Sequence, residues 1–133
     1  MKINNILADA VARILSSIRK NQSEVLLVKS KQIEEIVVIL RTYGYIHSFR
    51  IEKTFIRIIL KYSKDESVLK NIKYYSQLNI NNTVSFRQLN YLTKQKLALS
   101  GLSLFILSTP LGIISDYECL KNRKGGKLLL RIF

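Results

Sequence analysis

Apolar residues recur every three or four positions at the start of the chain, which predicts an amphipathic helix. The apolar stripe extends from Ile3 to Ile18, and Arg13, Arg19 and Lys20 lie elsewhere around the helix. The stripe is typical of a helix that faces a core. The three cations could reach phosphate groups, and a basic amphipathic helix could also lie on a membrane.

A strand and a second helix follow. Val25–Val28 is a short apolar run that predicts a buried strand. Ser30 is suited to cap a helix from Lys31 to about Tyr43, which Gly44 ends. Apolar residues again recur at helical spacing in this segment, so we expect one side of the helix to be buried.

Alternating apolar and polar residues predict two further strands, about Tyr45 to Ile51 and Phe55 to Tyr62, with a short hairpin connection between them. The polar segment Ser63–Ser67 then has the composition of a connector. We therefore expect an N-terminal α/β lobe over residues 1–65, with the order helix, strand, helix, strand, strand.

The remaining residues, 66–133, predict a second lobe that is mainly β with short helices. Val68–Ser76 is predicted as a strand, with a helix as the local alternative, and Leu78–Thr83 as a turn or edge segment. Ser85 begins a capping-box pattern, which predicts a short helix toward Leu92, and Thr93–Ser100 is predicted as a link. The fold class is α+β, with two small lobes.

The most informative stretch follows an apolar strand that ends at Leu107. Ser108-Thr109-Pro110-Leu111-Gly112 is predicted as a tight turn, because Pro110 fixes its own φ and Gly112 permits geometry that other residues avoid. We expect the hydroxyls of Ser108 and Thr109 at the tip of a rigid loop that is open to a partner. The opposing interpretation is a hairpin turn capped by its own hydroxyls.

A capping box, Ser115 to Glu118, predicts a helix of about two turns that begins at Asp116. Its end carries cations that complement the C-terminal carbonyls, and a glycine pair is expected to stop it. An apolar strand then closes the chain. The basic residues and glycines of this region are Lys121, Arg123, Lys124, Gly125, Gly126 and Lys127.

The charge of the chain indicates a polyanionic partner. Twenty-two Lys and Arg face nine Asp and Glu, for a net charge of +13, and the surplus is spread along the chain. Nucleic acid, an anionic membrane, or mere solubility of a basic protein would each account for it. Because 47% of the residues are hydrophobic and only one is Pro, the chain is not a disordered basic tail.

Several chemistries are disfavoured by residue counts. Cys119 is the only Cys and His47 the only His, so an intramolecular disulfide, a Cys/His zinc site and a Ser-His-Asp triad are not expected. No glycine-rich phosphate loop is present. Helix capping accounts for Asp116 and Glu118. We therefore predict no enzymatic activity, no cofactor and no metal site, and a packed thiol at Cys119.

The C-terminal residues resemble a known family. Ser108-Thr109, Gly112, the capping box and the glycine pair before a terminal apolar strand follow the order found in the bacterial-type small-subunit ribosomal protein eight family. Pro110 departs from the family's second Ser, and Lys127 stands where the family carries Glu. Upstream matches follow the family's order over nearly the whole chain, and the segment before Gly101 is several residues longer than usual.

The resemblance implies a structural constituent of the small ribosomal subunit that binds the central domain of small-subunit ribosomal RNA and supports assembly and translation. Its partners would be that RNA and neighbouring small-subunit ribosomal proteins, with no membrane and no small-molecule substrate. The residues expected to bind RNA are Ser108, Thr109, Pro110, Gly112, Lys121, Arg123, Lys124, Gly125, Gly126 and Lys127, with Arg13, Arg19, Lys20, Ser30 and Lys31 from the first lobe.

Two other functions stay open, a peripheral module for anionic membranes and a non-ribosomal RNA chaperone or repressor. No apolar run is long enough to span a membrane, and no signal peptide is visible. A cleaved presequence has nowhere to fit, so we expect synthesis where the protein works. The abundance of Ile, Asn, Lys and Tyr is typical of an AT-rich genome. We predict a mitochondrial ribosome, with a plastid or a bacterial cytoplasm as alternatives.

Overall fold

The computed structural model describes residues 6–75, 82–99 and 103–133. The chain divides into two compact units, Met1–Asn71 and Ile72–Phe133. Our sequence-based boundary lay between residues 65 and 66, a few residues earlier. The two units are described separately below.

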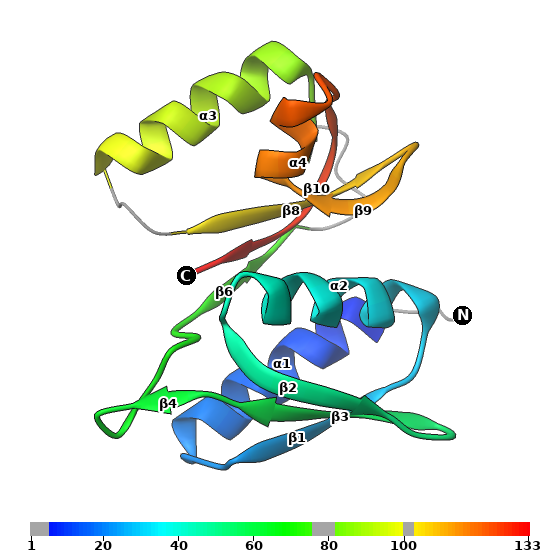
Figure 1. Cartoon of the computed structure of the whole chain (residues 1–133), viewed down its shortest axis with the longest axis vertical. Coiled ribbons are helices and arrows are strands. Elements are labelled where there is room, and N and C mark those ends of the chain that lie inside the picture. The colour runs from blue at the N-terminus through cyan, green and yellow to red at the C-terminus, as the bar shows by residue number, and fades with distance from the viewer. Residues whose placement is uncertain (1–5, 76–81, 100–102) are drawn as a thin grey trace. The chain divides into compact units, whose positions relative to one another are not determined.

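The N-terminal unit contains a three-stranded antiparallel sheet in the order β1-β3-β2. Figure 1 shows its two helices on the same side of this sheet. The predicted order of elements is confirmed, with α1 at Ile6–Arg19, β1 at Glu24–Val28, α2 at Lys31–Thr42, β2 at Ile46–Ile51 and β3 at Phe55–Leu60. The predicted start of the first helix at Ile3 lies outside the described residues.

Alternation along β3 explains why one face of this sheet is covered. Ile56 and Ile58 have no exposed surface, whereas Phe55, on the other face, is 42% exposed. The second helix begins as predicted, because the Ser30 hydroxyl accepts a hydrogen bond of 3.2 Å from the Ile33 amide. Gly44 follows its end with a φ of +81°, which glycine adopts at little cost.

The segment predicted as a connector forms a small hairpin. Tyr62–Ser63 is β4 and Glu66–Ser67 is β5, and the two strands pair. Lys64 and Asp65 form the turn with φ values of +53° and +66°. Our prediction was wrong here because the side chains of such an exposed hairpin are polar, which makes its composition resemble that of an unstructured link.

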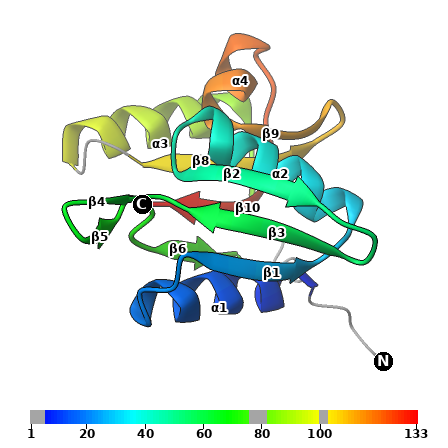
Figure 2. The ribbon, with the colours of Figure 1, turned by 60° about the horizontal axis from the view of Figure 1, so that its bottom comes forward.

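The C-terminal unit is organised around its last strand, β10, at Gly126–Ile132. This strand pairs with β8 on one side and with β6 and β7 on the other. In Figure 2, α3 and α4 lie on one side of β8 and β10. The other elements are β6 at Ile72–Tyr74, β7 at Thr83–Val84, α3 at Phe86–Leu99, β8 at Leu104–Thr109, β9 at Gly112–Ser115 and α4 at Asp116–Lys121.

Two predictions for this unit need correction. The strand expected over Val68–Ser76 is limited to Ile72–Tyr74 among the described residues, and most of the predicted turn at Leu78–Thr83 lies outside them. The capping box at Ser85 is confirmed by two hydrogen bonds with Gln88, of 2.8 and 3.2 Å. However, the helix that it starts continues to Leu99, where we expected a link from Thr93.

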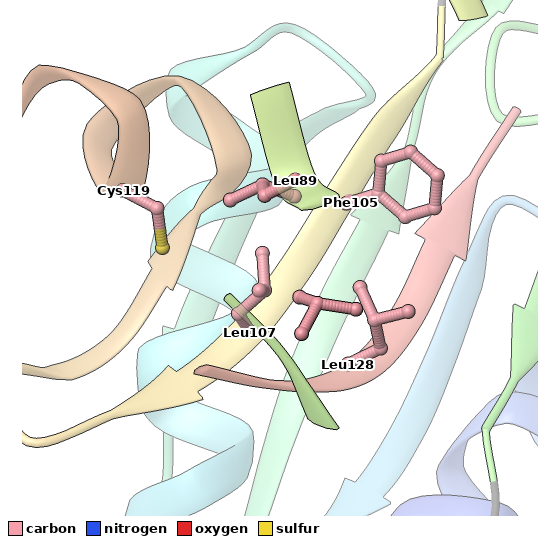
Figure 3. Close-up of a cluster of buried hydrophobic side chains, with 6 residues drawn as sticks. Leu89, Phe105, Leu107, Cys119 and Leu128 are labelled. Carbon is pink, nitrogen blue, oxygen red and sulfur yellow. The ribbon is translucent and has the colours of Figure 1, made fainter. Parts of the chain in front are cut away.

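A buried cluster joins the two helices to the sheet (Figure 3). Leu89 of α3 and Cys119 of α4 have no exposed surface, and they pack with Phe105, Leu107 and Leu128 of β8 and β10. Burial raises the pKa of the Cys119 thiol to about 11, because the thiolate would lose its hydration. The prediction of a packed thiol is confirmed.

Candidate nucleic-acid interface

The predicted turn is the tip of the hairpin formed by β8 and β9. Thr109 pairs with Gly112, so only Pro110 and Leu111 form the connection. Gly112 has a φ of +114°, a conformation that L side chains rarely adopt. Ser108 and Thr109 are therefore the last residues of a strand. Our placement of both hydroxyls at the loop tip was wrong.

The two neighbouring hydroxyls are used differently. Thr109 Oγ1 donates a hydrogen bond of 2.8 Å to the Gly112 carbonyl and accepts one of 3.1 Å from the Leu111 amide. It therefore serves the turn itself, as the opposing interpretation held. The Ser108 side chain is exposed. Of the two, Ser108 is better placed to meet a partner.

Residues from three strands form a row beside the turn. Lys127 of β10 pairs with Ser108 of β8 on one side and with Thr83 of β7 on the other. Directly paired residues of a sheet project from the same face. The structure therefore brings together Ser108 and Lys127, which lie far apart in the sequence.

The glycine pair has a different role from the one predicted. The last turn of α4 is closed by Arg123 with a φ of +55°, and by hydrogen bonds from its amide to Leu120 and from the Lys124 amide to Cys119. Neither glycine has a positive φ that would identify it as the helix stop. Our expectation that the glycines end the helix was wrong.

Both glycines instead allow close contact between backbones. A Cβ on Gly125 would overlap the Val84 carbonyl and lie 2.8 Å from Ser85 Cα. A Cβ on Gly126 would lie 2.6 Å from the Ser108 carbonyl oxygen. The missing side chains therefore keep β10 close to β8 and to the segment that starts α3.

The hydrogen bond from the Glu118 amide to the Ser115 hydroxyl, which is one half of the predicted capping box at α4, is confirmed. The Ser115 hydroxyl accepts a hydrogen bond of 3.2 Å from the Glu118 amide. Asp116 does more than begin the helix, because its buried carboxylate accepts hydrogen bonds from the Thr93 hydroxyl at 3.3 Å and the Tyr117 amide at 3.0 Å. It thus ties α3 to α4, a contact that sequence reasoning missed because Thr93 had been assigned to a link.

Three cations lie at the surface at the end of α4 and just beyond it. The side chains of Lys121, Arg123 and Lys124 are exposed, and none forms an ion pair within the part of the chain that the structure describes. The sequence of this unit holds only two acidic residues, Asp116 and Glu118. These cations are therefore available to phosphate groups of a partner.

The candidates in the N-terminal unit lie at helix ends and along α1. Arg13 pairs with Asp9 at 2.9 Å, whereas Arg19 and Lys20 are exposed at the end of α1. The Ser30 hydroxyl is engaged in capping α2, and Lys31 is exposed at its first position. Arg19, Lys20 and Lys31 thus present their charge to solvent, whereas Ser30 chiefly shapes the helix start.

Comparison with known proteins assigns the chain to a family. The model of the ribosomal protein S8 family matches residues 5–133. The chain belongs to this family. Small ribosomal subunit protein uS8 of Bartonella bacilliformis is 32% identical over 139 residues that cover all of both chains. The protein of that name from Campylobacter jejuni subsp. doylei is 30% identical over 136 residues, covering 98% of this chain and 99% of its own.

Membership in the S8 family makes the chain a structural, non-enzymatic protein of the small ribosomal subunit. No three His, Cys, Asp or Glu side chains gather as a candidate metal site within residues 6–75, 82–99 and 103–133. In the same residues, no helix has the length and apolar character needed to cross a membrane.

Sequence reasoning also gave no role to the exposed side of α3. Tyr91 is 66% exposed, and Arg87 lies one turn before it on the same helix. The signal was present in the sequence as a cation and an aromatic residue at helical spacing. The predicted helix, which was expected to end at Leu92, included both residues, but no role was drawn from their spacing.

Proposed function

We propose that this S8-family protein binds small-subunit ribosomal RNA directly, through the end of the C-terminal sheet where Ser108 and Lys127 are paired. That pairing is the observation on which the proposal depends. A hydroxyl can donate to a phosphate or a ribose hydroxyl, and the neighbouring ammonium supplies countercharge. The two groups come from β8 and β10, so their positions are set by the sheet.

The surrounding charge supports an anionic partner. The C-terminal unit contains nine Lys and Arg and two Asp and Glu, for a net charge of +7. Lys121, the last residue of α4, and Arg123 and Lys124 just beyond it are exposed. Neutralising RNA phosphates with such side chains releases condensed counterions, which favours binding at low salt.

The backbone geometry supports recognition of a folded RNA by its shape. Gly125 and Gly126 bring three backbone segments close together without intervening side chains. Folded RNA is recognised largely through shape, 2′-hydroxyls and phosphates, which suits a fixed surface. In this proposal the protein holds a local fold of the central domain during assembly of the small subunit.

The N-terminal unit contributes phosphate contacts in the same proposal. Arg19 and Lys20 at the end of α1, with Lys31 at the start of α2, would position the RNA without selecting its sequence. Arg13 is included, although its pairing with Asp9 reduces the charge that it can offer. Ser30 would act through the shape of the helix start that it caps.

We further propose that this ribosomal protein works in a mitochondrion. The support is compositional, because the abundance of Ile, Asn, Lys and Tyr is typical of an AT-rich genome. The relatives named above are bacterial proteins. Mass spectrometry of small subunits purified from mitochondria, plastids and cytoplasm of the source cells tests the assignment. Recovery of the protein only from plastid or cytoplasmic particles would contradict it.

RNA binding is tested with a transcript of the central domain of small-subunit ribosomal RNA. For four to six phosphate contacts, the affinity should fall roughly a hundredfold or more between about 50 and 200 mM salt. Lys127→Gln should weaken binding about tenfold, because it removes a charge at the proposed interface. Lys73→Gln is the matched control, since Lys73 pairs with Arg131 at the opposite end of β10.

Equal effects of the two lysine substitutions, or an affinity that does not change with salt, would contradict the proposal. Sedimentation with anionic vesicles provides the second arm of the test. Tight vesicle binding with no binding to the transcript would favour the membrane alternative, and binding to unrelated RNA with equal affinity would favour an RNA chaperone.

A further inference from the structure

The surface of α3 carries an exposed aromatic side chain. Leu89 and Thr93 of this helix are buried, and Tyr91 lies roughly on the opposite side, with 66% of its surface exposed. Tyr91 is the most exposed large hydrophobic side chain in the described part of the chain. Its ring is not among the side chains that pack against the buried cluster of the unit.

A groove lies beside this ring. Its volume is about 430 Å³, and its walls come from β7 and from the first two turns of α3. The side chains that line it are Thr83, Val84, Arg87, Gln88, Tyr91 and Leu92. The groove thus combines apolar surface with one aromatic and one cationic side chain.

The charge of α3 favours an anionic occupant. The helix sequence contains Arg87, Lys94 and Lys96 and no acidic residue. Arg87 precedes Tyr91 by four positions and Lys94 follows it by three, so both lie next to the ring on the helix surface. The side chains of Arg87 and Lys94 are exposed. A protein surface rich in acidic residues could use the cations, but it would have no particular need for the exposed ring.

The groove is also continuous with the proposed RNA surface. Thr83, which lines the groove, pairs with Lys127, and Lys127 pairs with Ser108. A nucleic acid bound at Ser108 and Lys127 could therefore extend across β7 toward α3. This inference rests on the proposed RNA-binding function and adds a second contact of a different chemical kind.

We propose that Tyr91 stacks on an unpaired base of RNA, with Arg87 and Lys94 contacting the flanking phosphates. Stacking on an aromatic ring is available to every base, because each has a π face, and it requires that the base be unpaired. The α3 groove therefore takes single-stranded RNA, whereas the Ser108 and Lys127 row serves a folded RNA surface.

The absence of Trp from the sequence provides a direct test. Tyr91→Trp introduces a single indole at the site, and Tyr43→Trp places one in the N-terminal unit, where Tyr43 is 38% exposed. The probes are a ten-nucleotide oligouridine, a ten-base-pair RNA duplex and a ten-residue polyglutamate. We expect the oligouridine to quench the indole fluorescence of the Tyr91→Trp variant strongly and the duplex to quench it weakly. Neither RNA should quench the Tyr43→Trp variant.

Affinity measurements give an independent readout. Tyr91→Ala should weaken binding of the oligouridine by between about fivefold and a hundredfold, and Tyr91→Phe should retain most of it, because stacking depends on the ring. Thermal unfolding of both variants should match the parent, since the side chain is exposed. Unchanged oligouridine affinity in Tyr91→Ala, or quenching by polyglutamate in place of oligouridine, would overturn the inference.

The outcomes for the two sites can be distinguished. In one outcome, the central-domain transcript binds with strong salt dependence and Lys127→Gln weakens this binding, but Tyr91→Ala has no effect on either RNA. The proposed surface at Ser108 and Lys127 would then be retained, and the proposed contact at α3 would be wrong. If no RNA binds at all, the proposed function itself fails.

Discussion

The two units differ in how they balance their positive charge. Residues 1–71 contain thirteen Lys and Arg with seven Asp and Glu, whereas residues 72–133 contain nine Lys and Arg with two acidic residues. In the N-terminal unit, acids lie beside cations, as in the pairs Arg13–Asp9 and Lys70–Glu66. A cation that already has an acidic neighbour offers less to a phosphate group than a cation without one.

Arg57 shows this balance most clearly. Its guanidinium contacts Glu52 at 3.1 Å and Glu24 at 2.8 Å, and these carboxylates raise its pKa, with the Glu52 hydrogen bond as the largest cause. In the C-terminal unit, Asp116 and Glu118 both lie in the first turn of α4. The comparison indicates that the first unit pairs several of its charges within its own fold, whereas the second leaves Lys121, Arg123 and Lys124 exposed.

The largest expected effect is a loss of stability, which should differ between a glycine of the C-terminal unit and one of the N-terminal unit. Gly125→Ala should destabilise the protein by about 3 kcal/mol, because the new Cβ meets the backbone of Val84 and Ser85, which cannot easily move. Gly44→Ala should cost about 1 kcal/mol, since it has a positive φ but its Cβ would meet only Lys61 Nζ, at an ordinary contact distance of 3.9 Å. Urea denaturation measures both. Equal losses would mean that the close backbone contact is not a requirement of the C-terminal unit.

The core of the C-terminal unit should lose stability at high pH. Because burial raises the pKa of Cys119 to about 11, the unfolded chain releases this proton first, near pH 8.5 to 9. The contribution is therefore complete below that range and is lost as the pH rises toward 11, by about 2 to 3 kcal/mol. Cys119→Ala removes the thiol. The tyrosines and lysines, which also titrate at high pH, are present in both proteins, so the variant is the matched control. Parallel stability curves for the two proteins between pH 8 and 11 would contradict this expectation.

The cations at the end of α1 test whether the N-terminal unit contributes phosphate contacts. Arg19→Gln with Lys20→Gln should weaken binding of the central-domain transcript and of an unrelated RNA by similar factors, about tenfold, because phosphate contacts position RNA without selecting its sequence. Filter binding at one fixed salt concentration measures both. A loss confined to the central-domain transcript would show that this helix end takes part in recognition.

The smallest expected effects distinguish the roles of two adjacent hydroxyls, those of Ser108 and Thr109. Thr109→Val should cost about 1 kcal/mol of stability, because it removes the two hydrogen bonds within the turn. Ser108→Ala should leave the stability unchanged and weaken RNA binding by a few fold. Unfolding and binding are measured on both variants. If Thr109→Val weakened RNA binding more than Ser108→Ala without loss of stability, our assignment of the two hydroxyls would be reversed.

Local features of the fold could be predicted from the sequence. Ser30, Ser85 and Ser115 each begin a helix where the capping patterns placed them, and Ile56 and Ile58 of β3 share the buried face of the strand that alternation predicted. These features depend on residues within a few positions of each other. Propensity and hydrophobic spacing contain that information.

The features that could not be predicted depend on residues that are distant in the sequence. Gly125 is required by the backbone of Val84, and Asp116 is bound by Thr93, although no local pattern links either pair. The pairing of Lys127 with Ser108 likewise follows from the register of β8 and β10. Of the candidate site, the motif residues could thus be named, but their mutual positions required the structure.

The most direct test compares two matched sets of three cations. Lys121, Arg123 and Lys124 are exposed in the C-terminal unit, and Lys53, Lys61 and Lys64 are exposed in the N-terminal unit. Each set is replaced by Gln, and the affinity for the central-domain transcript is measured from low to moderate salt. Each set includes one residue with a positive φ, Arg123 or Lys64, so replacement by Gln should have a similar effect on backbone strain in the two sets.

If the C-terminal unit presents its charge to RNA, the slope of log affinity against log salt should become shallower by about 2 to 3 for the C-terminal set. The N-terminal set should change it by less than about 1. Equal changes in slope for the two sets, or a larger change for the N-terminal set, would contradict the proposal that the C-terminal unit carries the main RNA-binding surface.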